Sequence, residues 1–132
     1  MRRVDRMRAN LHLSSVANHP LQNYLRTHRR RTGFFQEEVA ALLGAASGTK
    51  VSLHENFARR PALNAAFAYE IIFNRPAHEL FAGDYEDVRL AVRSRAALLA
   101  KRLREKTPGS RSLRVTRKLE LLQAITESKP FA

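Results

Sequence analysis

The sequence contains no cysteine, which excludes a disulfide framework and a zinc site built from thiolates. It also has no apolar run near the roughly 18 residues that a membrane span needs. The arginines close to Met1 are not followed by the uninterrupted apolar stretch of a secretion signal. We therefore expect a soluble, cytoplasmic protein that has no membrane partner.

Patterns typical of β-strands are scarce in this chain. Strict alternation of apolar and polar residues is rare, whereas apolar residues recur at spacings of three and four through most of the length. The 132 residues are enough for a domain of about 60 to 70 residues with a helical extension. The expected fold class is all-α.

Positive charge is abundant and unevenly distributed. The chain has 24 Lys and Arg against 12 Asp and Glu, a net charge of +12, which favours a polyanionic partner. Residues 1–31 hold eight basic residues and one acidic residue, residues 32–83 hold four and five, and residues 84–132 hold twelve and six. The two basic flanks could attract phosphate while the middle supplies the fold. The alternative is that these charges are ordinary solvated surface.

Three short helices are predicted in the first half of the chain, after an N-terminal arm over 1–18 that is basic and weakly periodic. Gly33 and Gly44 are expected to end the first and the second helix, because glycine adopts the left-handed conformation that often follows a helix. The expected bounds are Pro20 to Arg31, 36–43 and about 49–57, with a turn over 45–48. The side chains expected to face the core are Val39, Ala40, Leu42, Leu43 and Val51.

Four further helices are predicted. Their expected bounds are 62–73, a short helix after Pro76 that stops at Gly83, 85–106 and 112–127, with a break at Thr107, Pro108, Gly109 and Ser110. The helix over 62–73 is the most apolar and is expected at the centre of the core. The last helix places Val115, Leu119, Leu122 and Ile125 along one side. The expected organisation is an arm over 1–18, a domain over 19–83 and a basic helical extension over 84–132.

The sequence of the middle segment resembles that of a known protein family. FQEEVAALLG, AASGTKVSLHENFARRP and ALNAAFAYEIIFNRPAHELF resemble the Cro/repressor-type (XRE) helix-turn-helix family over about residues 21–82, a little under half of the chain. The features that carry the resemblance are Gln36, Val39, Leu43, Gly44, Val51, Ser52, Glu55, Pro61 and the closing Glu79, Leu80 and Phe81. The resemblance implies a five-helix DNA-binding domain in which the third helix enters the major groove.

The resemblance also implies roles for individual residues. Gln36 would contact a phosphate at the start of the second helix, the alternative being a helix-capping glutamine. Lys50 would donate to guanine O6 or N7 or to a phosphate. The residues implied to face the groove are Ser47, Gly48, Thr49, Lys50, Ser52 and Leu53. Those implied to meet the sugar-phosphate backbone are Asn56, Arg59 and Arg60, the alternative being plain surface arginines at 59 and 60.

Two features depart from the family pattern. Six residues separate Gly44 from Val51, one more than is usual, so a change in the start of the third helix could rotate its outer face by about 100°. His54 occupies a position that is usually apolar and inward. If it is buried, we expect a neutral histidine with a satisfied hydrogen bond rather than a pH switch.

Fragments that imitate catalytic motifs have the wrong spacing. GAASGTK is one residue short of a P-loop and follows a predicted helix instead of a strand. His54-Glu55 and His78-Glu79 begin like the zinc-protease motif, but the second histidine is replaced by alanine. We expect neither an enzyme nor a cofactor or metal site.

The expected function is a sequence-specific transcription regulator that binds double-stranded DNA and associates with the nucleoid. The family implies a homodimer, and the apolar sides of the two C-terminal helices are the expected dimer surface, unless they fold back on the first and fifth helices. The alternative function is a protein- or RNA-interaction module, such as an antitoxin-like or co-regulatory subunit, that binds a partner through its C-terminal helices.

Overall fold

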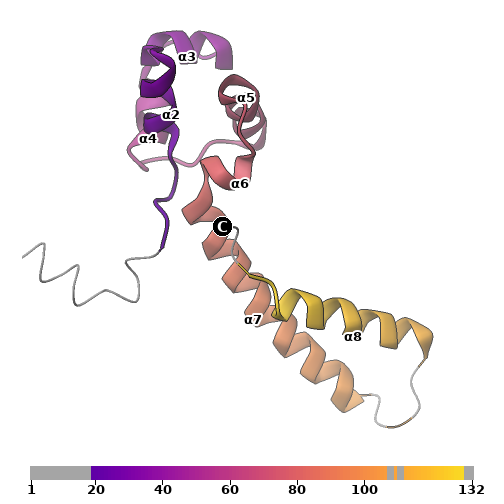
Figure 1. Ribbon diagram of the computed structural model, residues 1–132. Helices are drawn as coiled ribbons and strands as arrows, with labels where there is room; N and C mark the ends of the chain where they lie inside the picture. Colours follow the sequence, from indigo (N-terminus) through magenta and orange to yellow (C-terminus); the bar gives the residue numbers. More distant parts are fainter. Residues whose placement is uncertain (1–18, 107–108, 110–111, 130–132) are drawn as a thin grey trace, which may run out of the picture. The chain divides into compact units, whose positions relative to one another are not determined.

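The computed structural model describes residues 19–106, 109 and 112–129, and these form seven α-helices and no β-strand (Figure 1). The all-α prediction is therefore confirmed for this part of the chain. The predicted arm over 1–18 lies outside the described residues, as do Thr107, Pro108 and Ser110 of the predicted break. None of the helices in the described segments combines the length and the apolar character of a membrane span. The helices are α2 (Leu25–Thr32), α3 (Gln36–Leu43), α4 (Thr49–Glu55), α5 (Leu63–Phe73), α6 (Ala77–Leu80), α7 (Ala82–Lys106) and α8 (Leu113–Thr126).

The chain divides into two compact units between Tyr85 and Glu86. Helices α2 to α6 and the first residues of α7 belong to the first unit, and the rest of α7 and α8 belong to the second. The core of the first unit takes one or two side chains from each of α2 to α6, so each short helix buries one side. The buried apolar side chains are Leu25, Val39, Ala40, Val51, Tyr69, Phe73 and Leu80.

Helix α3 has the predicted bounds, and both α2 and α3 end at glycines in the left-handed conformation, Gly33 with φ 83° and Gly44 with φ 75°. Its inward side holds Val39 and Ala40, with Leu43 packed against them. The prediction that Leu42 is buried was wrong, because its side chain is 57% exposed. Successive helical residues are 100° apart, so Leu42 lies outside the arc that the other three occupy.

The first helix begins at Leu25 and not near Pro20, because the preceding backbone pairs elsewhere. The Tyr24 N–H donates to the Leu80 carbonyl at 2.8 Å, and the Gly83 N–H donates to the Leu21 carbonyl at 2.8 Å. Gly83 was predicted to be a helix stop, but it lies inside α7. A Cβ at this glycine would lie 2.4 Å from the Leu21 carbonyl oxygen, so the close backbone contact requires glycine.

Two other predictions need correction. Helix α4 ends at Glu55 and not at Phe57, which has a left-handed φ of 68° and takes the chain out of the helix. In α5, Phe73 is buried, but three apolar residues spaced four apart lie on the outside. These are Leu63, Phe67 and Ile71, which are 68%, 52% and 80% exposed. The most apolar segment is thus only partly in the core.

The second unit is a helical hairpin in which α7 and α8 bury their apolar sides against each other. Ala96 and Ala100 of α7 form one buried cluster with Leu119 and Leu122 of α8. The predicted apolar side of the last helix is therefore confirmed. These side chains cover one another, and the dimer surface expected on the two C-terminal helices stays a prediction.

Both ends of α8 are held by hydrogen bonds. The Ser112 hydroxyl accepts the Val115 N–H at 3.3 Å, which satisfies a backbone donor of the first turn. Near its C-terminal end, Arg89 of α7 donates from Nη1 to the Ser128 carbonyl at 2.6 Å and pairs with Glu86. The hairpin is therefore antiparallel.

Candidate nucleic-acid interface

The inner side of α4 is fixed to the core of the first unit. Val51, His54 and Glu55 follow the i, i+3, i+4 spacing of one helical face, and they are 1%, 1% and 4% exposed. Thr49 and Lys50 lie on the exposed side of the same short helix. The core therefore determines which residues of α4 face solvent.

Glu55 is the centre of a buried polar cluster that joins α4 to α2 and α3. Its Oε1 accepts hydrogen bonds from Arg29 Nη2 and from Gln36 Nε2, each at 3.1 Å, and its Oε2 accepts one from Arg29 Nε. Burial raises the pKa of Glu55, but the hydrogen bonds from Arg29 and Gln36 and the charges of Arg29 and Arg26 outweigh it, so the pKa is lowered. The carboxylate is therefore ionised at neutral pH.

His54 forms a second buried link. Its Nδ1 lies 2.8 Å from the Tyr69 hydroxyl, with which it shares a hydrogen bond, and its carbonyl accepts a 2.9 Å hydrogen bond from Asn23 Nδ2. Burial lowers the pKa of His54, and the charges of Lys50 and Arg59 lower it further. His54 is thus a buried histidine with a satisfied hydrogen bond, and at neutral pH its neutral form is favoured.

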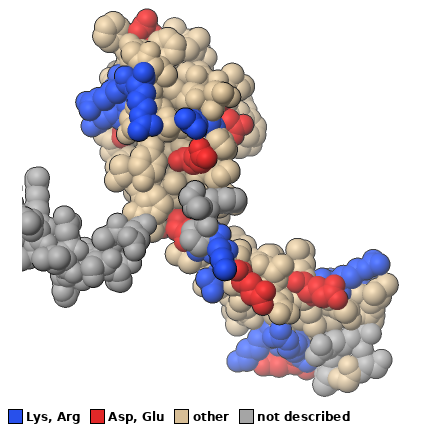
Figure 2. Space-filling model, viewed as in Figure 1, with Lys and Arg blue, Asp and Glu red and all other residues tan. Residues whose placement is uncertain are grey.

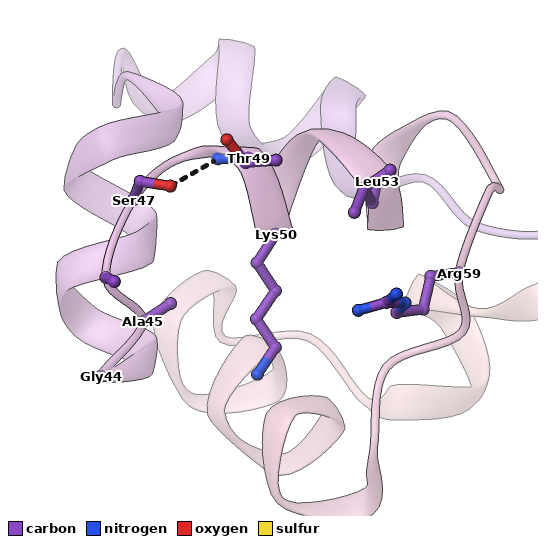
Figure 3. A pocket seen from close by; sticks show the side chains of 8 residues that line it. Gly44, Ala45, Ser47, Thr49, Lys50, Leu53 and Arg59 are labelled. Atoms are coloured by element: carbon purple, nitrogen blue, oxygen red, sulfur yellow. Dashed lines mark hydrogen bonds between the residues drawn. The ribbon is translucent and has the colours of Figure 1, made fainter.

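An open hollow of about 490 Å³ lies beside α4 and the preceding turn (Figure 3). Lys50 and Arg59 extend from two different segments toward this space. Two cations that converge in this way repel each other, and an anion between them would remove the repulsion. No acidic side chain lines the hollow among the described residues; its lining residues are Gly44, Ala45, Ala46, Ser47, Thr49, Lys50, Leu53 and Arg59.

The hollow brings together five of the ten predicted contact residues: Ser47, Thr49, Lys50, Leu53 and Arg59. Helix α4 begins at Thr49 as predicted, and Val51 is in the core. The Ser47 hydroxyl accepts the Thr49 N–H at 3.4 Å in this turn.

The other five predicted residues do not line the hollow. Gly48 is buried against α3, where a Cβ would lie 3.0 Å from Glu37 Oε1. Ser52 is half-buried. Gln36 uses its side-chain N–H for the bond to Glu55. Within the loop after α4, the Asn56 side-chain oxygen accepts the Ala58 N–H at 3.2 Å.

Arg60 is exposed but already has a partner. Its Nε lies 3.3 Å from Asp84 Oδ1, and the side chains of the two residues are 74% and 19% exposed. An anionic ligand at Arg60 would therefore compete with a carboxylate of the same chain. Arg59, the preceding residue, has no such ion pair with any described residue.

Sequence reasoning missed three small residues that line the hollow. Gly44, Ala45 and Ala46 were treated only as a stop and a turn, yet they line the space together with the cations. Their signal in the sequence is the run of small residues directly before the polar start of α4. Small side chains leave the room that larger ones would fill.

The wider surface is consistent with a polyanionic ligand. In Figure 2, basic side chains form patches on both units, with acidic side chains between them. Within the described segments, no three His, Asp or Glu side chains gather to hold a metal ion.

No protein-family model matches the chain, and no curated protein or solved structure is significantly similar to it.

Proposed function

We propose that this protein is a sequence-specific transcription regulator of the Cro/repressor type that binds double-stranded DNA. In this proposal α3, the turn and α4 form the helix-turn-helix, and α4 enters the major groove. The observation that carries it is the hollow beside α4, which is lined by five predicted contact residues from α4, the turn before it and the loop after it, two of them converging cations.

Each side chain of the hollow has a chemical role in the proposal. Lys50 donates to guanine O6 or N7, while Ser47 and Thr49 bond base edges or phosphate oxygens through their hydroxyls. Leu53 offers apolar contact to a thymine methyl group. Arg59 neutralises a phosphate at the groove edge and thereby orients the helix without reading sequence.

The buried side of α4 supports this role. A base-reading helix must be held to within a fraction of an ångström, because hydrogen bonds to base edges are short and directional. The Glu55 cluster and the His54 to Tyr69 bond fix α4 against three neighbouring helices. The bases then meet a surface that is already ordered.

A homodimer that acts in the cytoplasm on the nucleoid completes the proposal. Two copies of α4 would meet two half-sites about 34 Å apart, one turn of the duplex. Such a complex selects a two-fold symmetric DNA sequence. The symmetry of the selected site therefore reports on the dimer.

The second candidate function is a helix-turn-helix-derived module that binds protein or RNA without reading bases. The lining of the hollow by the small Ala45 and Ala46 and by the apolar Leu53 favours it, because these side chains form no hydrogen bonds with base edges. Such a module protects no defined DNA site. DNA selection therefore separates the two functions.

The experiment is selection from a randomised double-stranded DNA pool at about 150 mM salt, a concentration at which contacts to phosphate alone are weakened. The proposal predicts a short two-fold symmetric motif. Lys50→Ala should blur one position of each half-site, with a discrimination loss of about 1–3 kcal/mol. Arg59→Ala should weaken binding to all sequences alike, and the matched control Arg75→Ala, which removes a cation outside the hollow, should change neither.

Recovery of no motif, with binding that disappears as salt rises, would contradict the regulator and favour the interaction module. An unchanged motif with Lys50→Ala would move base reading away from the hollow.

A further inference from the structure

The second unit carries a surface of its own, apart from the hollow beside α4. A hollow of about 330 Å³ opens on the outer side of α8, lined by Leu113, Arg114, Arg117, Lys118 and Leu121. All five residues are exposed, and the two leucines are 65% and 63% exposed. Two leucines and three cations thus share one small area of a single helix.

The exposed leucines have no role in the packing of the hairpin. Helix α8 buries Leu119 and Leu122 against α7, and Leu113 and Leu121 are not part of this buried cluster. The two outer leucines are eight residues apart, so they lie on one row with Arg117 between them. Apolar side chains that are exposed to water outside the core cost free energy, and contact with a partner would remove this cost.

The three cations are also free to meet a partner. Within the described residues none of Arg114, Arg117 and Lys118 forms an ion pair, and no acidic side chain lines the hollow. Neighbouring like charges on one helix repel each other. Carboxylates brought by a ligand would therefore relieve a repulsion as well as form new pairs.

We infer that this surface binds an acidic amphipathic segment of a partner protein. Its carboxylates pair with the three cations, and its apolar side chains enter the hollow between Leu113 and Leu121. Eight residues of helix span about 12 Å, which matches about two turns of a bound helical segment. The site is independent of DNA binding by α4.

Charge and shape select this occupant over others. A second copy of a chain with net charge +12 is repelled from a cationic surface. A phosphate backbone would leave both leucines without an apolar partner. A membrane surface needs a continuous apolar face on the helix, but here Arg117 interrupts the outer row and the apolar face of α8 is packed on α7.

The test measures binding of the full-length protein to three fluorescent helical peptides of equal length by anisotropy. The first peptide has glutamates and leucines on one face, the second has its leucines replaced by glutamine, and the third has its glutamates replaced by glutamine. Only the first should bind, with a Kd in the range of about 1–100 µM.

Two matched charge reversals locate the site. Arg114→Glu/Lys118→Glu should weaken binding at least about tenfold, whereas Lys101→Glu/Arg104→Glu on α7, with the same change in net charge, should weaken it less than about twofold. Leu113→Ser/Leu121→Ser should also weaken binding about tenfold, because the apolar contact is lost. All of these residues are exposed, so circular dichroism should show unchanged helix content.

Several results would overturn the inference. No binding of the first peptide up to about 0.5 mM would do so, as would equal losses from the two charge reversals. If the peptide without leucines binds as tightly as the first peptide, the binding is non-specific charge attraction and the inference is wrong. Displacement of the peptide by vesicles of anionic lipid or by duplex DNA, sensitive to the same reversal, would replace the acidic segment with that ligand.

Discussion

The variant Glu55→Gln tests whether the buried cluster beneath α4 holds the first unit together. Glutamine has nearly the volume of glutamate but carries no charge. Arg29, whose side chain is 14% exposed, would then keep its charge in a buried place without its carboxylate partner. Arg29 Nη1 retains its bond to the Phe34 carbonyl, so the guanidinium does not escape to solvent without a further loss.

The expected loss of stability is large for a substitution this small. Removal of one partner from a buried ion pair costs about 3–5 kcal/mol, and the remaining amide oxygen of glutamine places Glu55→Gln near the lower end, at about 3 kcal/mol. A domain of this size loses about 4–8 °C in Tm for each kcal/mol. The first unit should therefore melt about 12–24 °C lower.

The assay is urea unfolding followed by the amide resonances of Leu25, Val51 and Tyr69, which report on the first unit alone. The control is Arg60→Gln, which breaks an ion pair whose arginine is 74% exposed and should cost no more than about 1 kcal/mol. A loss from Glu55→Gln as small as that of the control would refute the reasoning. Addition of Arg29→Met to Glu55→Gln should restore part of the stability, because the unpaired charge is then gone.

Three further predictions concern salt, pH and packing. If six to eight basic residues neutralise phosphates, log K for DNA should fall against log salt with a slope of about −5 to −7, and a slope near −1 would show that the basic flanks are not engaged. Burial lowers the pKa of His54, so the contribution of His54 to stability is complete above the ordinary pKa of 6.5 and is lost as pH falls below it toward the folded-state pKa. Between pH 7 and pH 5 the free energy of unfolding should therefore fall less steeply with pH in His54→Gln than in the unchanged protein. An equally steep fall in the variant would assign the pH dependence to other groups. Gly83→Ala should destabilise the protein by about 1–3 kcal/mol in thermal unfolding although alanine favours helix, because the new Cβ meets the Leu21 carbonyl; a stabilised variant would contradict the close contact.

Local signals in the sequence predicted the helices well and their environment less well. The bounds of α3 followed from its apolar spacing and from Gly44, both of which act within a few residues. The start of α2 depended instead on pairing with residues almost 60 positions away, which no local pattern contains. Gly83 is of the residue type that often ends a helix, but its actual role depends on the close contact with Leu21.

The candidate site shows the same division. The inward placement of Val51 and the buried, hydrogen-bonded His54 could be predicted from their positions on one helix. The convergence of Arg59 with Lys50 could not, because the chain leaves α4 through the left-handed Phe57 before it returns to the hollow. The DNA contacts assigned to the hollow stay predictions until the selection experiment is done.

The two-sided character of α4 has a consequence for how this protein can change over evolutionary time. Its stability depends on Val51, His54 and Glu55, while its ligand would meet Thr49 and Lys50 on the other side. Substitutions on the outer side do not touch the core, so most should cost less than about 0.5 kcal/mol. New binding preferences are therefore accessible by single mutations, without first acquiring compensating changes elsewhere in the fold.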